Sequence, residues 1–264
     1  MTGNNFNNFH CPLVAENIIF LDEIGSTNDY AKDLIRGGKR AGTVVIAARQ
    51  TAGRGRLGRS WDGGVDNIYM SVIISPQKSA GNNPAHLTLM AGVCVCNVLN
   101  KLLKATKYEA LIKWPNDIVV DRKKVCGILT EGVALEAMHG VIGIGVNVNR
   151  SSFPSELEDK ATSLHMLTGL HYDMAEIIKM LLIELSAYYE RFESDGINSF
   201  IAEYKALCLN IGKDVTIHEN GEIYEALCLD IATDGGLYVH MLNGERRTLS
   251  SGEVSVRGIY ESDL

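Results

Sequence analysis

The chain has 264 residues, a formal net charge of −7, and 46% hydrophobic against 22% charged residues. This balance is typical of a folded globular protein and excludes a disordered chain. The net negative charge argues against a protein that binds nucleic acid through its whole surface, so any anion binding must be local. No stretch approaches the roughly 18 consecutive apolar residues of a membrane span. The segment 1–16 lacks the basic start and apolar centre of a signal peptide, and we interpret it as a frayed leader.

The next segments predict a helix and then two strands. The helix begins at Ser26 or Thr27, whose side chains can cap it, and ends at the glycine pair 37–38. β-Branched residues predict strands over 42–50 and 67–75. The loop between these strands is therefore tethered at both ends to one sheet, which is a common setting for a binding loop.

Further along, the chain predicts helices on either side of a set of antiparallel strands. A helix that is apolar on nearly all sides begins at Asn83-Pro84 and should be buried against the sheet. Two more helices are expected, one opening at Asp173 and one over 198–208. Short turns predict antiparallel pairing among the intervening strand-like runs, which are 110–120, 123–135 and 140–149.

After Asn210 the pattern changes to short alternating runs separated by Asn-Gly and Asp-Gly turns. Such turns between apolar alternation are the strongest local signal for β-hairpins. About 50 residues of this pattern predict a small β-barrel. We therefore expect a larger domain over 1–210, including the leader, and a β domain over 211–264. The six cysteines form no CxxC pair, which predicts reduced, buried thiols and a cytoplasmic protein.

The segment RQTAGRGRLGRSW, residues 49–61, stands out because it holds four arginines and three glycines and no acid; we name it the arginine loop. Glycine lets backbone N–H groups approach a ligand, and arginine carries a forked donor set that matches phosphate and carboxylate. The loop is neither a Walker loop nor a dinucleotide fingerprint. The residues alone leave three alternatives open: a solvated basic loop, a cradle for clustered anionic oxygens, and a nucleic-acid patch.

Three other segments place polar groups or glycines at strand ends. In IKWPNDIVV, a proline-containing kink carries Lys113, Trp114, Asn116 and Asp117, where Trp114 could equally be a core residue and Asp117 could simply hold the turn. A hairpin tip at 121–124 carries two lysines, which are usually solvated. Two glycines spaced two apart in a strand open the same face, either for a flat ligand or for a closely packed helix; these are Gly143 and Gly145.

Together, GSTNDYA, RQTAGRGRLGRSW, NIYMSVIIS, IKWPNDIVV, KKVCGIL and GIGVNVN resemble the biotin–protein ligase family, in its order, over nearly the whole chain from about Asn17. The resemblance implies an α+β fold: a mixed, mainly antiparallel sheet with helices, related to class II aminoacyl-tRNA synthetases, followed by an SH3-like β-barrel. It implies an enzyme that converts biotin and MgATP to biotinyl-5′-adenylate. The biotin then passes to one lysine of a carboxyl carrier domain of a carboxylase or decarboxylase.

The resemblance also implies roles for single residues. Biotin contacts match Ser26, Thr27, Asn28, Gln50, Gly53, Arg54, Gly55, Arg56, Lys124, Gly127, Gly143 and Gly145. ATP or adenylate contacts match Arg56, Arg59, Trp61, Lys113, Asn116, Lys124 and Asn147. The catalytic residues implied are Lys124, Arg54, Arg56 and Asp117, the last in an orienting role. Lys124 is preferred to its neighbour Lys123 because it lies three residues before Gly127, as in the family pattern.

Several alternatives remain beside this prediction. A lipoate or octanoate ligase shares the fold and the adenylation chemistry. A DNA-binding biotin regulator is disfavoured by the net charge of −7, and a biotin-binding module without activity is disfavoured by Lys124. The motifs begin at Gly25, so we expect no room for the helix-turn-helix that some members carry, and no nucleic-acid or membrane partner. Leu57 stands where some relatives have a third arginine.

Biotin, ATP and Mg²⁺ are the expected small molecules, with the metal ligands and a homodimer left open. We also expect residues 51–61 to be mobile until ligand binds, because like charges and glycines hold a loop poorly.

Overall fold

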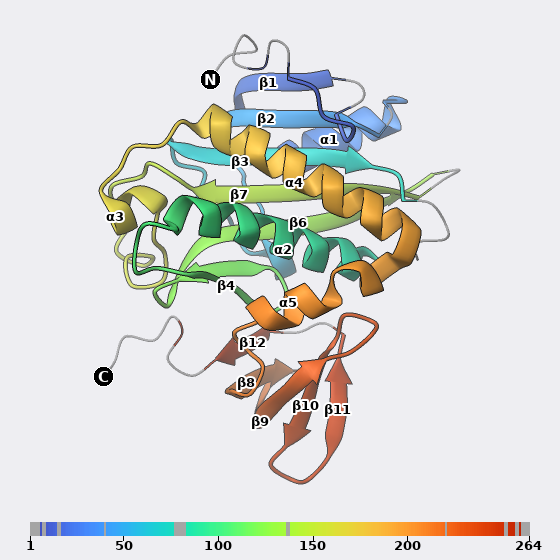
Figure 1. Cartoon of the computed structure of the whole chain (residues 1–264), viewed down its shortest axis with the longest axis vertical. Coiled ribbons are helices and arrows are strands. Elements are labelled where there is room, and N and C mark those ends of the chain that lie inside the picture. The colour runs from blue at the N-terminus through green and yellow to red at the C-terminus, as the bar shows by residue number, and fades with distance from the viewer. Residues whose placement is uncertain are drawn as a thin grey trace.

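The computed structural model describes residues 6, 9–14, 17–39, 41–76, 83–135, 138–219, 221–250, 253–256 and 259. These residues form two sheets, a large one in the body of the molecule and a small one in the lobe that carries the C-terminus (Figure 1). The expected leader lies largely outside the described residues. Where it is described it is not frayed, because Phe6, Cys11 and Leu13 are buried in the hydrophobic core.

The large sheet has seven strands in the order β1-β2-β3-β7-β6-β5-β4. The strands are β1 Asn17–Ile24, β2 Thr43–Gln50, β3 Asn67–Ile74, β4 Ala110–Lys113, β5 Asp117–Val120, β6 Lys123–Ala134 and β7 Met138–Asn147. β1 and β2 pair in parallel, and every other neighbouring pair is antiparallel. The mixed, mainly antiparallel sheet is confirmed; the run 110–120 is two strands, β4 and β5, which a cis Trp114-Pro115 bond separates.

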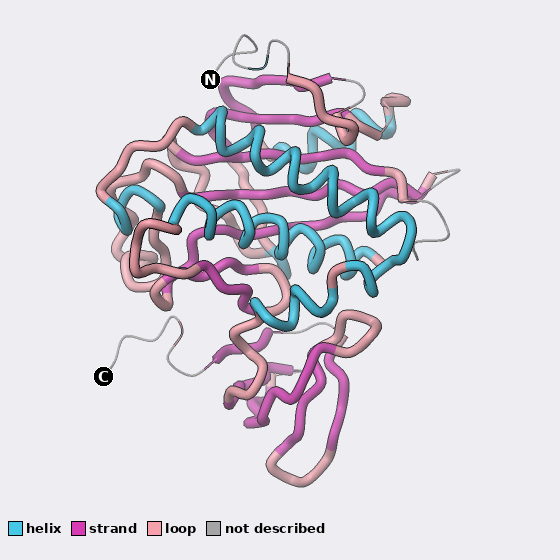
Figure 2. The backbone as a smooth tube through the Cα atoms, in the orientation of Figure 1, coloured by secondary structure: helices cyan, strands magenta, loops and turns pink. Residues whose placement is uncertain are grey.

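Helices cover both faces of this sheet (Figure 2). α2, Pro84–Leu103, and α4, Met174–Asp195, lie on one face, and α1, Thr27–Arg36, lies on the other (Figure 1). The alternation of strand residues explains the division: Ile46, Met70 and Val72 point toward α2 and α4, while Val45 and Ile73 pack under α1. Shorter helical segments are Arg56–Gly58, α3 Leu164–Thr168, Gly196–Ser199 and α5 Ile201–Leu207.

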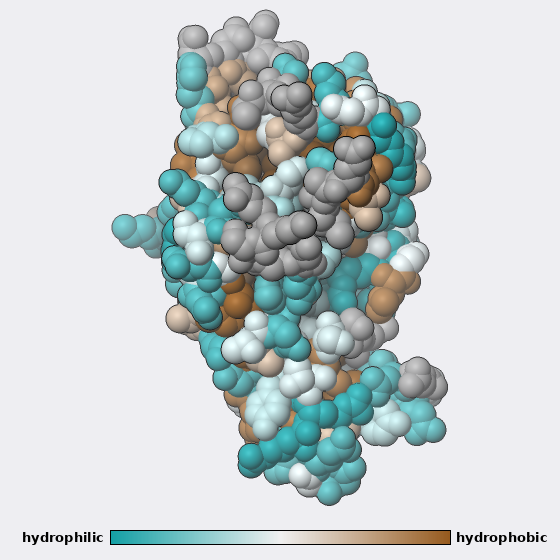
Figure 3. All heavy atoms as spheres, turned by 90° about the vertical axis from the view of Figure 1, so that its right-hand side faces the viewer, coloured by the Kyte–Doolittle hydropathy of each residue, from teal (hydrophilic) through white to brown (hydrophobic). Residues whose placement is uncertain are grey.

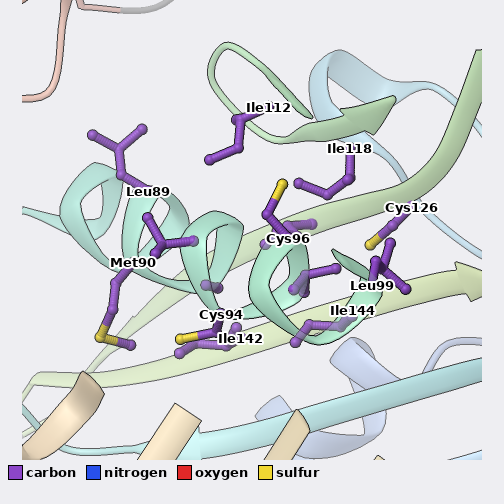
Figure 4. Close-up of a cluster of buried hydrophobic side chains, with 14 of the residues drawn as sticks. Leu89, Met90, Cys94, Cys96, Leu99, Ile112, Ile118, Cys126, Ile142 and Ile144 are labelled. Atoms are coloured by element: carbon purple, nitrogen blue, oxygen red, sulfur yellow. The ribbon is translucent and has the colours of Figure 1, made fainter. Parts of the chain in front are cut away.

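The core centres on α2, as Figure 4 shows. Five residues of this helix, Leu89, Met90, Cys94, Cys96 and Leu99, meet five residues of the sheet, Ile112, Ile118, Cys126, Ile142 and Ile144. By length and hydropathy α2 could cross a membrane, but 67% of the relevant window is buried inside this core. All six cysteines are free and buried, as predicted. Burial raises the pKa of the Cys94 and Cys96 thiols, so these groups are unreactive.

The C-terminal lobe is a five-stranded antiparallel sheet, the small SH3-like domain expected from the sequence, with the order β11-β10-β9-β8-β12. Its strands are β8 Asp214–Glu219, β9 Glu222–Ile231, β10 Leu237–Met241, β11 Arg246–Leu249 and β12 Glu253–Val256. Asn220, in the first predicted hairpin turn, lies outside the described residues. The lobe presents mainly hydrophilic side chains on the face shown in Figure 3. It docks on the larger domain through the buried indole of Trp114, whose Nε1 donates to the Gly235 carbonyl at 3.0 Å.

Candidate functional site

A cavity of about 210 Å³ lies where the arginine loop crosses β6 and β7. The start of α1 forms one end, the β4–β5 kink forms the other, and two residues of β12 complete the wall. All the predicted site residues line it except Gly53 and Asn147. Residues on the lining that the sequence did not suggest for the site include Tyr69, Ile128, Leu129, Ile144, Val254 and Ser255.

The start of α1 gives the cavity a polar end. Ser26 caps the helix by accepting from the Asp29 backbone N–H, and the Thr27 backbone N–H donates to Gln50 Oε1 at 2.8 Å. Asn28 is 4% exposed, and its Oδ1 accepts a 2.7 Å hydrogen bond from the hydroxyl of Ser71 on β3. The helix therefore delivers three consecutive buried polar side chains to one spot.

Gly143 makes room for that arrangement. A Cβ atom at this position would lie 2.1 Å from Asn28 Oδ1, so only glycine permits α1 to approach β7 this closely. Gly127 and Gly145 open the same face further along, and there the space holds the indole of Trp61, 2.6 and 2.8 Å from where the two Cβ atoms would be. Close helix packing, one of the two alternatives raised for these glycines, thus occurs at Gly143, while binding of a flat ligand stays a prediction.

The arginine loop is held by specific contacts. The Trp61 backbone N–H donates to the Gly53 carbonyl at 2.9 Å, which ties the two ends of the loop together. Arg54 forms ion pairs with Glu131 at 2.5 Å and Asp29 at 2.9 Å. Arg56 donates to Asn116 Oδ1 at 3.3 Å. The premise that these charges have little to hold them is therefore wrong, because α1, β6 and the β4–β5 kink supply partners. Loop mobility itself stays a prediction.

Positive charge gathers at the other end of the cavity. Lys124 Nζ lies 2.6 Å from Asp117 Oδ1 on the neighbouring strand and 5.2 Å from the centre of the Trp61 ring. Burial lowers the pKa of the Arg56 guanidinium, and the charge of Asp117 counteracts part of that effect. Among the described residues, no cluster of three or more His, Cys, Asp or Glu side chains could hold a metal ion.

Two predicted residues lie behind the cavity wall. Asn147 is 4% exposed and donates to the Thr162 carbonyl at 3.1 Å, so it braces the end of β7. At Gly53, a Cβ would stand 2.7 Å from the Trp61 carbonyl oxygen, so glycine is needed for the loop ends to meet. Ser71 was missed although it touches both Thr27 and Asn28. Its one sequence signal is a hydroxyl in the middle of an apolar strand.

The site thus combines a buried polar end that suits a small hydrogen-bonding ring with a cationic end that suits carboxylate and phosphate oxygens. Residues 20–147 match the biotin/lipoate A/B protein ligase family, and residues 211–257 match the biotin protein ligase C-terminal domain. Fold and site therefore define a protein ligase of this kind.

Known relatives narrow the class. The chain is 34% identical over 90% of its length to the bifunctional ligase/repressor BirA of Bacillus spizizenii, of which it covers 74%. It is 32% identical over 88% of its length to the biotin–[acetyl-CoA-carboxylase] ligase of Mycobacterium tuberculosis, of which it covers 86%. The solved structure of the Aquifex aeolicus biotin protein ligase in complex with biotin and ATP superposes with a TM-score of 0.79 at 30% identity. That likeness covers 92% of this chain and 99% of the other. The chain belongs to the biotin protein ligases.

Proposed function

We propose that this protein activates biotin with ATP to form biotinyl-5′-adenylate and transfers the biotin to a lysine of a biotin carboxyl carrier domain. The observation that carries the proposal is the two-ended cavity. Its polar end, Thr27, Asn28 and Gln50, offers hydrogen bonds to the cyclic urea of biotin, and its cationic end, Arg56 and Lys124, lies where the carboxylate and the nucleotide would meet.

In the first step a biotin carboxylate oxygen attacks the α-phosphorus of ATP, and pyrophosphate leaves. Both reactants are anions, so their repulsion is part of the barrier. Lys124 and Arg56 offset it as fixed cations in a cavity that shields charge from water. Arg54 lines the same cavity, and it would add its charge only after leaving Asp29 and Glu131. Asp117 is placed to orient Lys124.

Magnesium enters this scheme with the nucleotide. Mg²⁺ at kinase, ATPase and polymerase sites is usually held by one or two carboxylates together with substrate phosphates. Asp117 is the carboxylate on the cavity lining, so it would hold the ion together with the phosphate oxygens. When bound, the ion would neutralise phosphate charge that the side chains do not reach.

In the second step the ε-amine of the carrier lysine attacks the acyl carbon of the adenylate, and AMP leaves. The enzyme needs no nucleophile of its own, and its task is to hold the mixed anhydride away from water. The arginine loop lies over the cavity with Arg56, Leu57, Arg59 and Trp61 on the lining, so it is the segment placed to do so.

We place the protein in the cytoplasm on the basis of its six free, buried cysteines.

Exchange of radioactive pyrophosphate into ATP tests the first step. We expect exchange that depends on biotin and not on lipoate or octanoate. Neither competitor carries a urea, so binding would bury Asn28 Oδ1 against carbon and sulfur with only the hydrogen bond from Ser71 made. Exchange with lipoate or octanoate alone would reverse the assignment. Transfer to a purified carrier domain, detected by mass spectrometry, tests the second step.

A further inference from the structure

We propose that Glu131 is a positioning residue that fixes the amide of Asn28 as a hydrogen-bond acceptor for the cyclic urea of biotin; this inference rests on the proposed function. Gly127, Leu129 and Glu131 occupy alternate positions of β6, so all three face the α1 side of the sheet. Its side chain is 23% exposed. It does not line the cavity, and none of the roles assigned above uses it.

The amide nitrogen of Asn28 already donates both of its hydrogens within the protein. Nδ2 carries two hydrogens; one is directed to the Leu129 carbonyl at 3.1 Å and the other to Glu131 Oε2 at 2.9 Å. Oδ1 accepts from Ser71 and lies in the space above Gly143, on the cavity lining. One lone pair of that oxygen is left, which makes it an acceptor for an N–H group of the ligand.

An ionised carboxylate can only accept hydrogen bonds, so it admits a single orientation of this amide. A flipped Asn28 would place its oxygen against both the Glu131 carboxylate and the Leu129 carbonyl. Ser71 then donates its only hydrogen to Asn28, and Thr27 donates its own to Gln50 Oε1 at 3.1 Å. Together with the Leu129 carbonyl, the Glu131 carboxylate thus sets the donor and acceptor pattern of this end of the cavity.

The other oxygen of Glu131 keeps the carboxylate charged. Oε1 accepts from Lys32 at 2.9 Å and from Arg54 at 2.5 Å. Burial opposes ionisation of Glu131, but hydrogen bonds from Lys32, Asn28 and Arg54 outweigh burial and lower its pKa. The same contact ties the arginine loop to the urea end of the cavity.

Glu131→Gln tests the proposal, because glutamine keeps the shape but offers both a donor and an acceptor. In biotin-dependent pyrophosphate exchange we expect KM for biotin to rise about tenfold, the loss of one well-oriented hydrogen bond, while KM for ATP stays within a factor of about two. Dethiobiotin, which keeps the urea and lacks the sulfur, should lose affinity by the same factor. Glu131→Asp, which keeps the charge, should recover part of the affinity.

Glu184 on α4 provides a matched control. It accepts from Asn97 at 3.0 Å and Lys101 at 2.7 Å, the same partner types, but it lies against α2 and away from the cavity. Glu184→Gln should leave KM for biotin unchanged. An unchanged KM in Glu131→Gln, or a fall in kcat and stability alone, would overturn the inference. Absence of exchange in the wild type would instead refute the proposed function. If Glu131→Gln does not fold, Glu131→Asp provides the test. An unchanged KM for biotin in that variant, together with an unchanged affinity for dethiobiotin, would contradict the proposal.

Discussion

Replacing Lys124 by methionine removes one charge from the cavity and leaves most of the aliphatic stem that packs beside Trp61. In the wild type the ammonium lies 2.6 Å from Asp117 and 5.2 Å from the indole centre, on the cavity lining. Removing one preorganised group that stabilises developing charge costs on the order of 10²–10³ in kcat, or about 2.7–4 kcal/mol. We expect a loss of that size in adenylate formation.

The same change should affect stability far less. Without ligand the Lys124 side chain is 27% exposed, so its ion pair with Asp117 is only partly withdrawn from water, and its removal should cost about 1 kcal/mol in the free energy of unfolding. Single-turnover formation of biotinyl-5′-adenylate measures the chemical step, and urea unfolding measures the stability. Together they separate a catalytic defect from a folding defect.

Lys123→Met is the control for this experiment. Lys123 precedes Lys124 on the same strand, but its Nζ donates to the Glu158 carbonyl at 2.8 Å and does not line the cavity. The variant should turn over like the wild type. Near-normal adenylate formation in Lys124→Met, or an equal loss in the two variants, would refute the assignment of the charge to this residue.

Three further outcomes follow from the structure. Gly143→Ala should raise KM for biotin and cost about 1–3 kcal/mol of stability by overpacking, while Gly37→Ala, with its nearest neighbour at 3.4 Å, should do neither. Biotin should alter the tryptophan emission of Trp114→Phe more than that of Trp61→Phe, because Trp61 covers Gly127 and Gly145 whereas Trp114, though on the lining, is 2% exposed and held against the small domain; equal responses would contradict this. The folded-state pKa of Glu131 lies below the usual 4.5. The contribution of its charge to the free energy of unfolding is therefore complete above pH 4.5 and is lost as pH falls through the folded-state pKa. The stability difference between wild type and Glu131→Gln, about 1 kcal/mol at pH 7, should shrink below pH 4.5, and a constant difference would exclude the role of the charge.

Much of the fold follows from local patterns. Apolar periodicity and capping residues place α1, α2 and α4 within a residue or two of their observed bounds. β1 was not predicted, because its sequence NIIFLDEI carries two adjacent acidic residues near its end and its partner β2 is reached through a helix. Parallel pairing across such a connection depends on tertiary packing that no short window contains. The same is true of the contact from Trp114 to the small domain, which joins residues 121 positions apart.

For the site, motif resemblance supplied most of the cavity lining, whereas the partners of those residues were not foreseen. Glu131 sits in the strand-like run KKVCGILTEGVAL, where a single acid normally points to solvent. Only the strand register, which sets it beside the start of α1, shows that it faces Asn28. Val254 and Ser255 come from a separate domain, and the sequence carries no signal that they approach the cavity.

The partners of the cations explain how an acidic chain keeps a basic loop over the cavity. Arg54 faces Asp29 and Glu131, and Lys124 faces Asp117, so these two cations are each paired with carboxylates before ligand arrives. Biotin carboxylate and phosphate can then replace protein carboxylates, an exchange of one anion for another around the same cations. Such an exchange avoids much of the desolvation that a fully hydrated lysine or arginine would undergo on binding. It also makes substrate affinity depend on how readily each carboxylate releases its partner, so substitutions at Asp117 and Asp29 should change KM as well as kcat.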